Sequence, residues 1–214
     1  KVLVHSNQFL DAICYPALSY GLTPLMQKEH PDSVGRLRTS AFTKLEEIFF
    51  DERQHDGYEY IQMIGLVGTK RVTKYVRRDY IKTPDNFEYY KIILPASNGS
   101  GALGEVLSTP LIGQPLIGHT QTFISIGKFD NKNEAEAAFK YIKSKFARAL
   151  LGILKITQHN PPEKWKYVPL QDFTVNSDID WSQSVAGIDR QLYAKYGLDE
   201  REIEFIETHV KEMR

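Results

Sequence analysis

Residues 58–78, with the sequence YEYIQMIGLVGTKRVTKYVRR, lie near the middle of the first half of the chain and decide its fold class. Residues 58–67 are rich in aromatic and β-branched side chains, Gly68 and Thr69 can form a turn, and residues 70–75 alternate in polarity. Two such segments on either side of a short turn predict a β-hairpin. Neither face of the second strand is purely apolar, so we expect one face to meet solvent or a ligand.

Two further segments, residues 87–95 and 120–127, have the character of strands. A loop of small residues, 96–102, follows the first of them. We therefore expect residues 57–130 to form a β-rich unit.

Helical patterns flank this unit on both sides. Asp32 and Ser33 can cap a helix that runs to about residue 50. Its apolar residues would lie on one side, namely Leu37, Ala41, Leu45, Ile48 and Phe49. Asn131 or Asn133 can cap a long helix over residues 134–156. Its apolar residues recur at steps of three and four and would form one buried stripe, namely Phe139, Ile142, Phe146, Leu150 and Ile153.

The end of the chain predicts a last helix, because Asp199 and Glu202 have the spacing of a capping box. Taken together, the patterns predict an α+β fold in three parts. These are an N-terminal helical segment (1–56), a β-rich target-recognition unit (57–130) and a C-terminal helical unit (131–214).

The composition is that of an ordinary globular protein, with 42% hydrophobic and 25% charged residues among 214. The single cysteine, Cys14, excludes an internal disulfide and gives no support to a cysteine-based zinc site. No apolar run is long enough to cross a bilayer, and no signal-peptide pattern opens the chain. We therefore expect a cytoplasmic protein with no membrane partner.

Basic and acidic residues balance at 27 each, but they are unevenly distributed. Basic residues concentrate in 65–82 and in 140–168, whereas acidic residues dominate after residue 172. Such a distribution can give a neutral protein one positive face for nucleic acid. From charge alone, solvated surfaces without a binding role are the preferred explanation of this distribution.

Three motifs share letters with catalytic or cofactor signatures, and each lacks the context that the chemistry requires. Asn160-Pro161-Pro162 begins like the base-gripping motif of adenine methyltransferases, but Glu163 follows where an aromatic residue is needed. The glycines in 99–104 match a dinucleotide loop, but no crossover helix can follow cleanly. Residues 84–91 place their acids and lysine too close together for a metal-dependent nuclease. We therefore predict no catalytic residue, no metal site and no cofactor in this chain.

The remaining signal is a set of basic and small polar side chains suited to DNA. Lysine and arginine neutralise phosphates, arginine can also read guanine, and short polar loops allow close approach to the backbone. The predicted DNA-binding residues come from the hairpin region, the small-residue loop and the long helix: Lys70, Arg71, Lys74, Arg77, Arg78, Lys82, Asn98, Ser100, Lys143, Lys145, Arg148 and Lys155. For the helix, a packing role in which Arg148 ties helices together is an equally good interpretation.

Several blocks, taken in order, resemble the Eco57I-type family of restriction-modification methylases. The blocks are YIKSKFARALL (141–151), KITQ (155–158), VPLQDF (168–173), LYAKYGL (192–198) and EIEFIE (202–207). Upstream, Gly104-Glu105, Thr120-Gln121-Thr122-Phe123 and Glu134-Ala135-Glu136 resemble the target-recognition region of the same family. The resemblance covers roughly residues 58–213.

The resemblance implies a bacterial adenine-N6 DNA methyltransferase that uses S-adenosylmethionine and has its catalytic half upstream. The cofactor loop and catalytic motif of the family have no counterpart here, so the resemblance implies recognition rather than methyl transfer. The chain begins without an initiator methionine, and we expect it to be a fragment. The expected partners are double-stranded DNA, the upstream methyltransferase domain and a nuclease domain or subunit. S-adenosylmethionine is expected for the parent enzyme only.

Two alternatives stay open at this point. The chain could be a type II restriction endonuclease that cleaves DNA with a divalent metal. It could also be an interaction module that docks a subunit of a restriction-modification complex, which the acidic C-terminal part favours.

Overall fold

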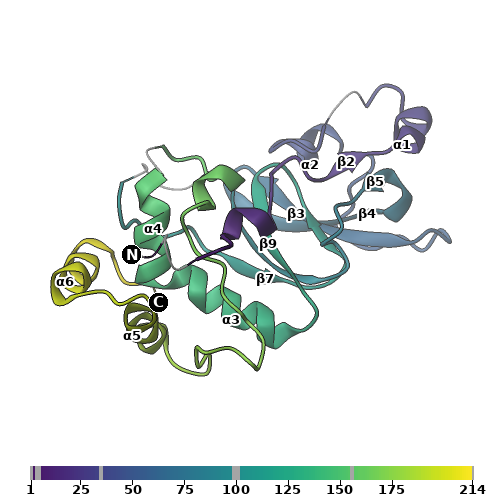
Figure 1. Cartoon of the computed structure of the whole chain (residues 1–214). Helices are drawn as coiled ribbons and strands as arrows, with labels where there is room; N and C mark the ends of the chain where they lie inside the picture. The colour runs from purple at the N-terminus through teal and green to yellow at the C-terminus, as the bar shows by residue number, and fades with distance from the viewer. Residues whose placement is uncertain (1, 3–5, 34–35, 98–101, 155–156, 214) are drawn as a thin grey trace.

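The computed structural model describes residues 2, 6–33, 36–97, 102–154 and 157–213. These residues form the mixed α+β fold that the sequence predicts. The longer helices gather at one end of the molecule, and two short helices lie at the other end, beside the hairpin (Figure 1). The longer helices are α3 (Lys132–Lys143), α4 (Lys145–Leu154), α5 (Val185–Lys195) and α6 (Glu200–His209), and the short ones are α1 (Pro24–Glu29) and α2 (Ala41–Lys44).

The hairpin predicted from residues 58–78 is confirmed. β3 (Tyr60–Val67) pairs antiparallel with β4 (Lys70–Arg77) along its whole length. Gly68 in the turn has φ of 60°, a left-handed conformation that glycine adopts without steric cost. β8 (Ile117–His119) pairs in parallel with the other side of β3, which gives a sheet of order β4-β3-β8.

A second sheet has the order β1-β9-β6-β7, and its neighbouring strands are antiparallel. Its strands are β1 (Cys14–Tyr15), β9 (Phe123–Phe129), β6 (Tyr90–Pro95) and β7 (Leu111–Gly113). The strands predicted over 87–95 and 120–127 correspond to β6 and β9, with boundaries shifted by a few residues. A separate pair is formed by β2 (Gly21–Leu22) and β5 (Ile81–Lys82).

Residues 120–122 carry the chain from the first sheet into the second, between β8 and β9. The Thr120 amide donates a hydrogen bond to the Ile64 carbonyl at 2.9 Å, and the Gln121 amide donates to the Leu37 carbonyl at 2.7 Å. Beside this crossing, Ile64, Ile93 and Phe123 form a small buried cluster that joins the two sheets. The crossing is therefore held on both sides by backbone hydrogen bonds and apolar packing.

The single helix predicted over 134–156 is wrong in one respect, because two helices, α3 and α4, occupy this range. Asn131 caps α3 as predicted, accepting a hydrogen bond from the Glu134 amide at 3.0 Å. Ser144 has ψ of 149°, which ends α3, and its hydroxyl accepts from the Ala147 amide at 3.1 Å in the first turn of α4. The break turns the end of the predicted stripe outward, so that Ile153 is 56% exposed.

The last predicted helix is confirmed as α6. Asp199 accepts from the Glu202 amide, and the Glu202 carboxylate accepts from the Asp199 amide, which completes the capping box. No helix within the described ranges is both long and apolar enough to cross a membrane.

The helix predicted from Asp32 and Ser33 to about residue 50 is wrong, because only α2 is helical there and residues 34–35 lie outside the described residues. Its predicted apolar face is nevertheless buried, and consists of Leu37, Ala41, Leu45, Ile48 and Phe49. These residues pack in one cluster with Ile61 and Met63 of the hairpin. The spacing of apolar residues by three and four thus predicted correctly which residues are buried. Most of them lie in turns rather than in a helix.

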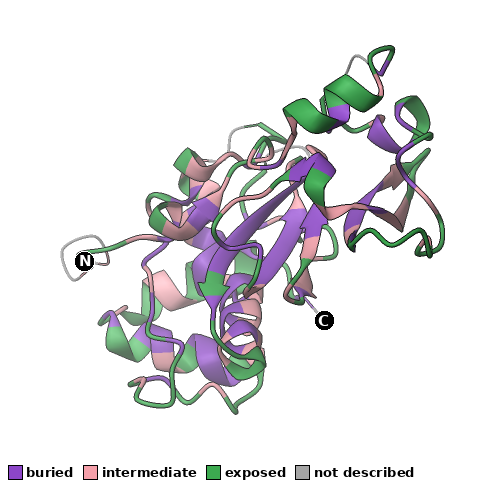
Figure 2. Ribbon diagram, turned by 90° about the vertical axis from the view of Figure 1, so that its right-hand side faces the viewer, coloured by how far each residue is buried: buried purple, intermediate pink, exposed green. Residues whose placement is uncertain are grey.

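The apolar interior consists mainly of two clusters. One lies between the β1-β9-β6-β7 sheet and the longer helices, and the other lies against the hairpin. Figure 2 shows that buried residues run along the central strands, whereas exposed residues lie on the outer sides of the helices. The pairing of β1 with β9 and these clusters cross the predicted boundaries at 57 and 131. The division into three parts stays a prediction.

Candidate nucleic-acid interface

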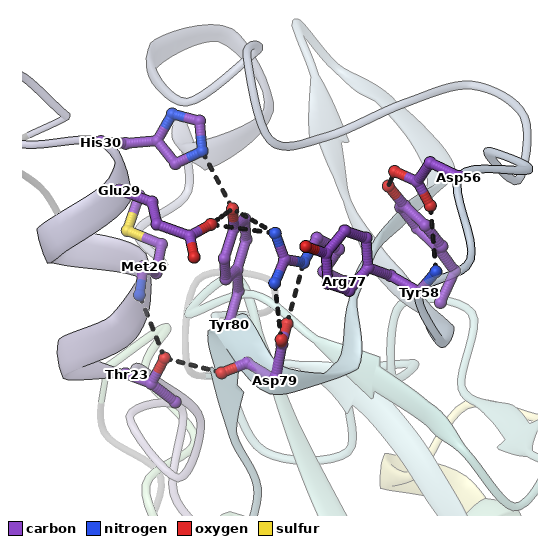
Figure 3. Close-up of polar contacts among 10 residues, drawn as sticks. Thr23, Met26, Glu29, His30, Asp56, Tyr58, Arg77, Asp79 and Tyr80 are labelled. Atoms are coloured by element: carbon purple, nitrogen blue, oxygen red, sulfur yellow. Dashed lines mark hydrogen bonds and ion pairs between the residues drawn. The ribbon is translucent and has the colours of Figure 1, made fainter.

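Arg77, at the end of β4, is enclosed by polar and aromatic side chains (Figure 3). Its guanidinium donates to both carboxylate oxygens of Asp79 at 3.1 and 2.7 Å, and to Oε2 of Glu29 at 2.9 Å. The rings of Tyr58 and Tyr80 lie against it, with centroids 3.5 and 4.2 Å from Cζ. Through its bond to Glu29, Arg77 joins α1 to the hairpin. Because only 11% of its side chain is exposed, it is hardly accessible to a ligand.

Three other basic residues of β4 and its end, Arg71, Lys74 and Arg78, also make contacts within the chain. Lys74 forms an ion pair with Asp51 at 2.9 Å. Arg78 lies over the Phe87 ring and donates to a backbone carbonyl. Arg71 donates to the carbonyl and the hydroxyl of Thr109 at 2.9 and 3.1 Å. Of these, Arg71 still borders a surface hollow, described below.

Arg148, at the first turns of α4, is 3% exposed. Its guanidinium donates to the backbone carbonyls of Lys143 at 3.1 Å, Glu105 at 3.2 Å and Lys211. These bonds join α4 to the segment before β7 and to the C-terminal segment. Arg148 is therefore a packing residue in this conformation, and a phosphate cannot reach it.

The other predicted contacts on these helices are also engaged. Lys145 forms an ion pair with Glu207 at 2.5 Å, and the Lys143 ammonium lies 5.1 Å from the centroid of the Phe139 ring. Lys155 lies outside the described residues.

Two predicted residues, Lys70 at the hairpin turn and Lys82 in β5, are exposed and have no ion-pair partner among the described residues. Lys70 directly follows Gly68 and Thr69, which border the surface hollows described next. Asn98 and Ser100 lie outside the described residues, but Ser97, which precedes them, borders the same region.

Three hollows adjoin at the junction of the two sheets, with volumes of about 610, 500 and 500 Å³. They share two lining residues, Thr39 and Gln121, and together we call them the junction depression. Its walls come from the turn before α2, the hairpin turn, the end of β6, the crossing between β8 and β9, and residues 159–162.

The described residues that line the junction depression include Arg36, Arg38, Arg71 and His159, and none of them is an aspartate or glutamate. A concave surface with cationic groups and no carboxylate concentrates positive potential, which favours anionic ligands. The remaining lining residues are small polar or apolar, and the amide of Gln121 is among them. The depression can therefore bind phosphate groups beside planar or apolar ligand parts.

Arg36 and Arg38 were not among the residues predicted from the sequence. Both are exposed, while Leu37 between them is buried at 3% exposure. The sequence signal is an apolar residue between two arginines. In the structure a tight turn at Leu37, where the Arg38 amide donates to the Arg36 carbonyl at 2.6 Å, leaves both arginines exposed. The wrongly predicted helix over this region concealed this signal.

The motif Asn160-Pro161-Pro162 borders the junction depression through its two prolines. The Asn160 side chain is fully buried, and its Nδ2 donates to the Pro95 carbonyl at 3.4 Å. Nearby, the Ser97 hydroxyl lies 3.0 Å from Nδ1 of the His159 ring at the rim. Because its amide points into the protein, Asn160 does not present a base-gripping group at the surface.

The acids and the lysine of residues 84–91 do not converge on one point. Lys91 is fully buried, and its ammonium donates to the carbonyls of Phe87, Tyr89 and Gln114 at 3.0, 3.0 and 3.2 Å. Burial lowers the pKa of Lys91 to about 7. Asp85 instead pairs with Lys128 at 3.2 Å on the surface. Within the described part of the chain, no three histidine, cysteine, aspartate or glutamate residues are placed to share a metal ion.

Comparison with known proteins gives no relative, since no family model, curated protein or solved structure matches this chain.

Proposed function

We propose that this chain binds duplex DNA, as the target-recognition part of a bacterial restriction-modification enzyme. The observation that carries the proposal is the junction depression, a concave surface to which Arg36, Arg38 and Arg71 contribute and where no described lining residue is a carboxylate. DNA presents a dense row of phosphates, and surfaces that bind it gather arginine and lysine in this way.

Two of the elements that border the depression supply phosphate contacts in this proposal. Arg36 and Arg38 contact phosphates from one wall, and Lys70 does so from the hairpin turn. Phosphate contacts position a protein on the duplex, whereas contacts to the base edges in the DNA grooves select the sequence. The net charge of the chain is zero, so affinity depends on this local concentration of charge rather than on bulk attraction.

The wider assignment rests on the resemblance in the C-terminal blocks. It includes an upstream methyltransferase domain that binds S-adenosylmethionine, a nuclease domain or subunit as a further partner, and a cytoplasmic location. It also includes the absence of catalysis by this chain alone. A cleavage assay with Mg²⁺ tests that last point, because site-specific cutting by this chain would favour the endonuclease alternative.

The first prediction concerns the two arginines that flank Leu37. The double variant Arg36→Ala/Arg38→Ala should bind a labelled duplex of random sequence about tenfold more weakly than the parent chain at moderate salt. The slope of log affinity against log salt should become shallower by about 2, because two phosphate contacts are lost. Fluorescence anisotropy across a salt titration measures both quantities.

The matched control is Arg190→Ala/Arg201→Ala, which removes the same charge from exposed positions on α5 and α6. These helices lie at the opposite end of the molecule from α2 (Figure 1). The control should bind as the parent chain does. Equal affinities and equal salt slopes for all three proteins would remove the junction depression from the interface.

A further inference from the structure

We propose that Gln121 is the residue that selects the DNA sequence, by reading an adenine edge from the centre of the junction depression. This inference rests on the proposed function and adds the base that the site recognises. It concerns one side chain that the sequence did not single out as a DNA contact.

Gln121 occupies the position where the three hollows meet, since it lines each of them. Its side chain is partly exposed, so a ligand in the depression can reach it. Its side-chain amide makes no hydrogen bond with any other described residue. A donor and an acceptor therefore remain available together on one planar group.

The backbone that carries Gln121 is fixed. Its own amide donates to the Leu37 carbonyl at 2.7 Å, and the Ala96 amide donates to the Thr122 carbonyl at 2.8 Å. The neighbouring Thr120 is fully buried. A side chain that reads a base must be held in place before the ligand arrives, because loosely held groups discriminate poorly.

Other polar side chains around the depression are already committed within the protein. The Thr43 hydroxyl donates to the Ser40 carbonyl, the Ser97 hydroxyl contacts His159, and the Thr109 hydroxyl accepts from Arg71. Among the described lining residues, Gln121 thus offers a free side-chain amide, and an amide can form two parallel hydrogen bonds where a hydroxyl cannot.

The chemistry of that amide identifies the base. In the major groove adenine presents N7 as an acceptor beside the N6 amino group as a donor. The Gln121 Nε2 donates to N7 while its Oε1 accepts from N6, and the other bases do not offer this pair. Arg36 and Arg38, which line the same hollow as Gln121, are placed to hold the flanking phosphates.

The experiment selects duplexes from a library of randomised sequence with the whole chain, and repeats the selection with Gln121→Ala. The parent chain should enrich a motif that contains adenine at one position. Gln121→Ala should lose roughly 5- to 100-fold of the preference for that adenine and keep the preference at the other positions. Its affinity for random duplex should stay within about twofold of the parent value, because phosphate contacts are unchanged.

The variant Gln121→Glu separates base reading from loss of folding, because we expect it to gain a new base preference, which an unfolded chain could not show. A carboxylate only accepts hydrogen bonds and suits the N4 amino group of cytosine, so the same position should change from adenine towards cytosine. Identical motifs for the parent chain and Gln121→Ala would overturn the inference, as would a parent chain that binds DNA without any preference. Identical motifs would leave the proposed function standing. Binding without preference would also remove target recognition, and no binding at any salt concentration would overturn DNA binding altogether.

Discussion

At the scale of single residues, the basic side chains of this chain divide into those that join segments and those that face solvent. Arg77 reaches Glu29, 48 positions away, and Arg148 reaches the Lys211 carbonyl, 63 positions away. Arg36 and Arg38 instead lie exposed at the junction depression. A guanidinium group with five N–H donors is well suited to either role, so residue type alone does not separate them.

The Arg77 cluster should contribute measurably to stability. Arg77→Ala removes the paired bonds to Asp79, the bond to Glu29 and the contacts with the Tyr58 and Tyr80 rings. We expect the free energy of unfolding to fall by about 1–3 kcal/mol, since the carboxylate partners are partly exposed and solvent screens them. Urea denaturation measures the change.

The control for this variant is Lys82→Ala, an exposed position, which should change the free energy of unfolding by less than about 0.5 kcal/mol. Arg77→Lys keeps the charge but not the planar fork, so its stability should fall between those of the parent chain and Arg77→Ala. If Arg77→Ala and the parent chain had the same midpoint of urea unfolding, the cluster would not stabilise the fold.

His119, in β8, should make the fold sensitive to acid. The ring is fully buried, its Nδ1 donates to the Thr120 carbonyl at 3.0 Å, and its Nε2 has no partner in the described ranges. Burial lowers the pKa of His119 from 6.5 to about 4. Between these two values the unfolded chain binds more protons, so stability is lost as the pH falls from 6.5 towards 4.

The test compares the parent chain with His119→Phe by thermal or urea unfolding across this pH range. The parent chain should lose up to about 1.4 kcal/mol per pH unit relative to the variant. Asp189, whose pKa burial raises from 3.8 to about 6, has the opposite sign in an overlapping range, so only the difference isolates His119. Parallel stability curves would show that His119 does not titrate differently on folding.

At the scale of elements, the break between α3 and α4 shows how a continuous helical pattern is interrupted. The apolar period runs through Ser144 without a gap, but Ser144 ends α3 and begins α4. Asp189 of α5 then accepts from the amides of Lys145 and Phe146 at 3.1 and 2.9 Å. The new helix start thus obtains acceptors for its unpaired amides from a residue that is distant in sequence.

Asp189→Ala should destabilise this start of α4. Two amides, one of them buried, would lose their acceptor, and we expect a fall of about 1–3 kcal/mol in the free energy of unfolding. The rate of amide hydrogen exchange should increase most at Lys145 and Phe146. Asp189→Asn keeps one acceptor oxygen and should lose less than Asp189→Ala.

Asp178→Ala is the matched control. It also removes a carboxylate, but this carboxylate forms a surface ion pair with Lys195 at the end of α5. Its effect should stay within about 1 kcal/mol. If Asp189→Ala and Asp178→Ala were equally stable, the carboxylate of Asp189 would not be needed at the start of α4.

At the scale of the whole molecule, the candidate site is a product of the junction between two sheets. The sequence predicted the hairpin, the strands and the capping box correctly, because each depends on local pattern or on neighbours within a few residues. It named Arg71 at the depression but missed Arg36 and Arg38. Gln121 entered only through the resemblance, because nothing local distinguishes it from an ordinary surface glutamine.

The sequence by itself thus determined the α+β class, the hairpin with its turn at Gly68, and the burial of the apolar residues that recur over 37–49. Only the tertiary structure decided which cations are enclosed, where the helices break, and that segments near residues 38, 70, 96, 121 and 160 meet in one depression. The physical reason is range. Periodicity and capping act over a few residues, whereas burial of a charge and closure of a hollow depend on partners that only folding brings together.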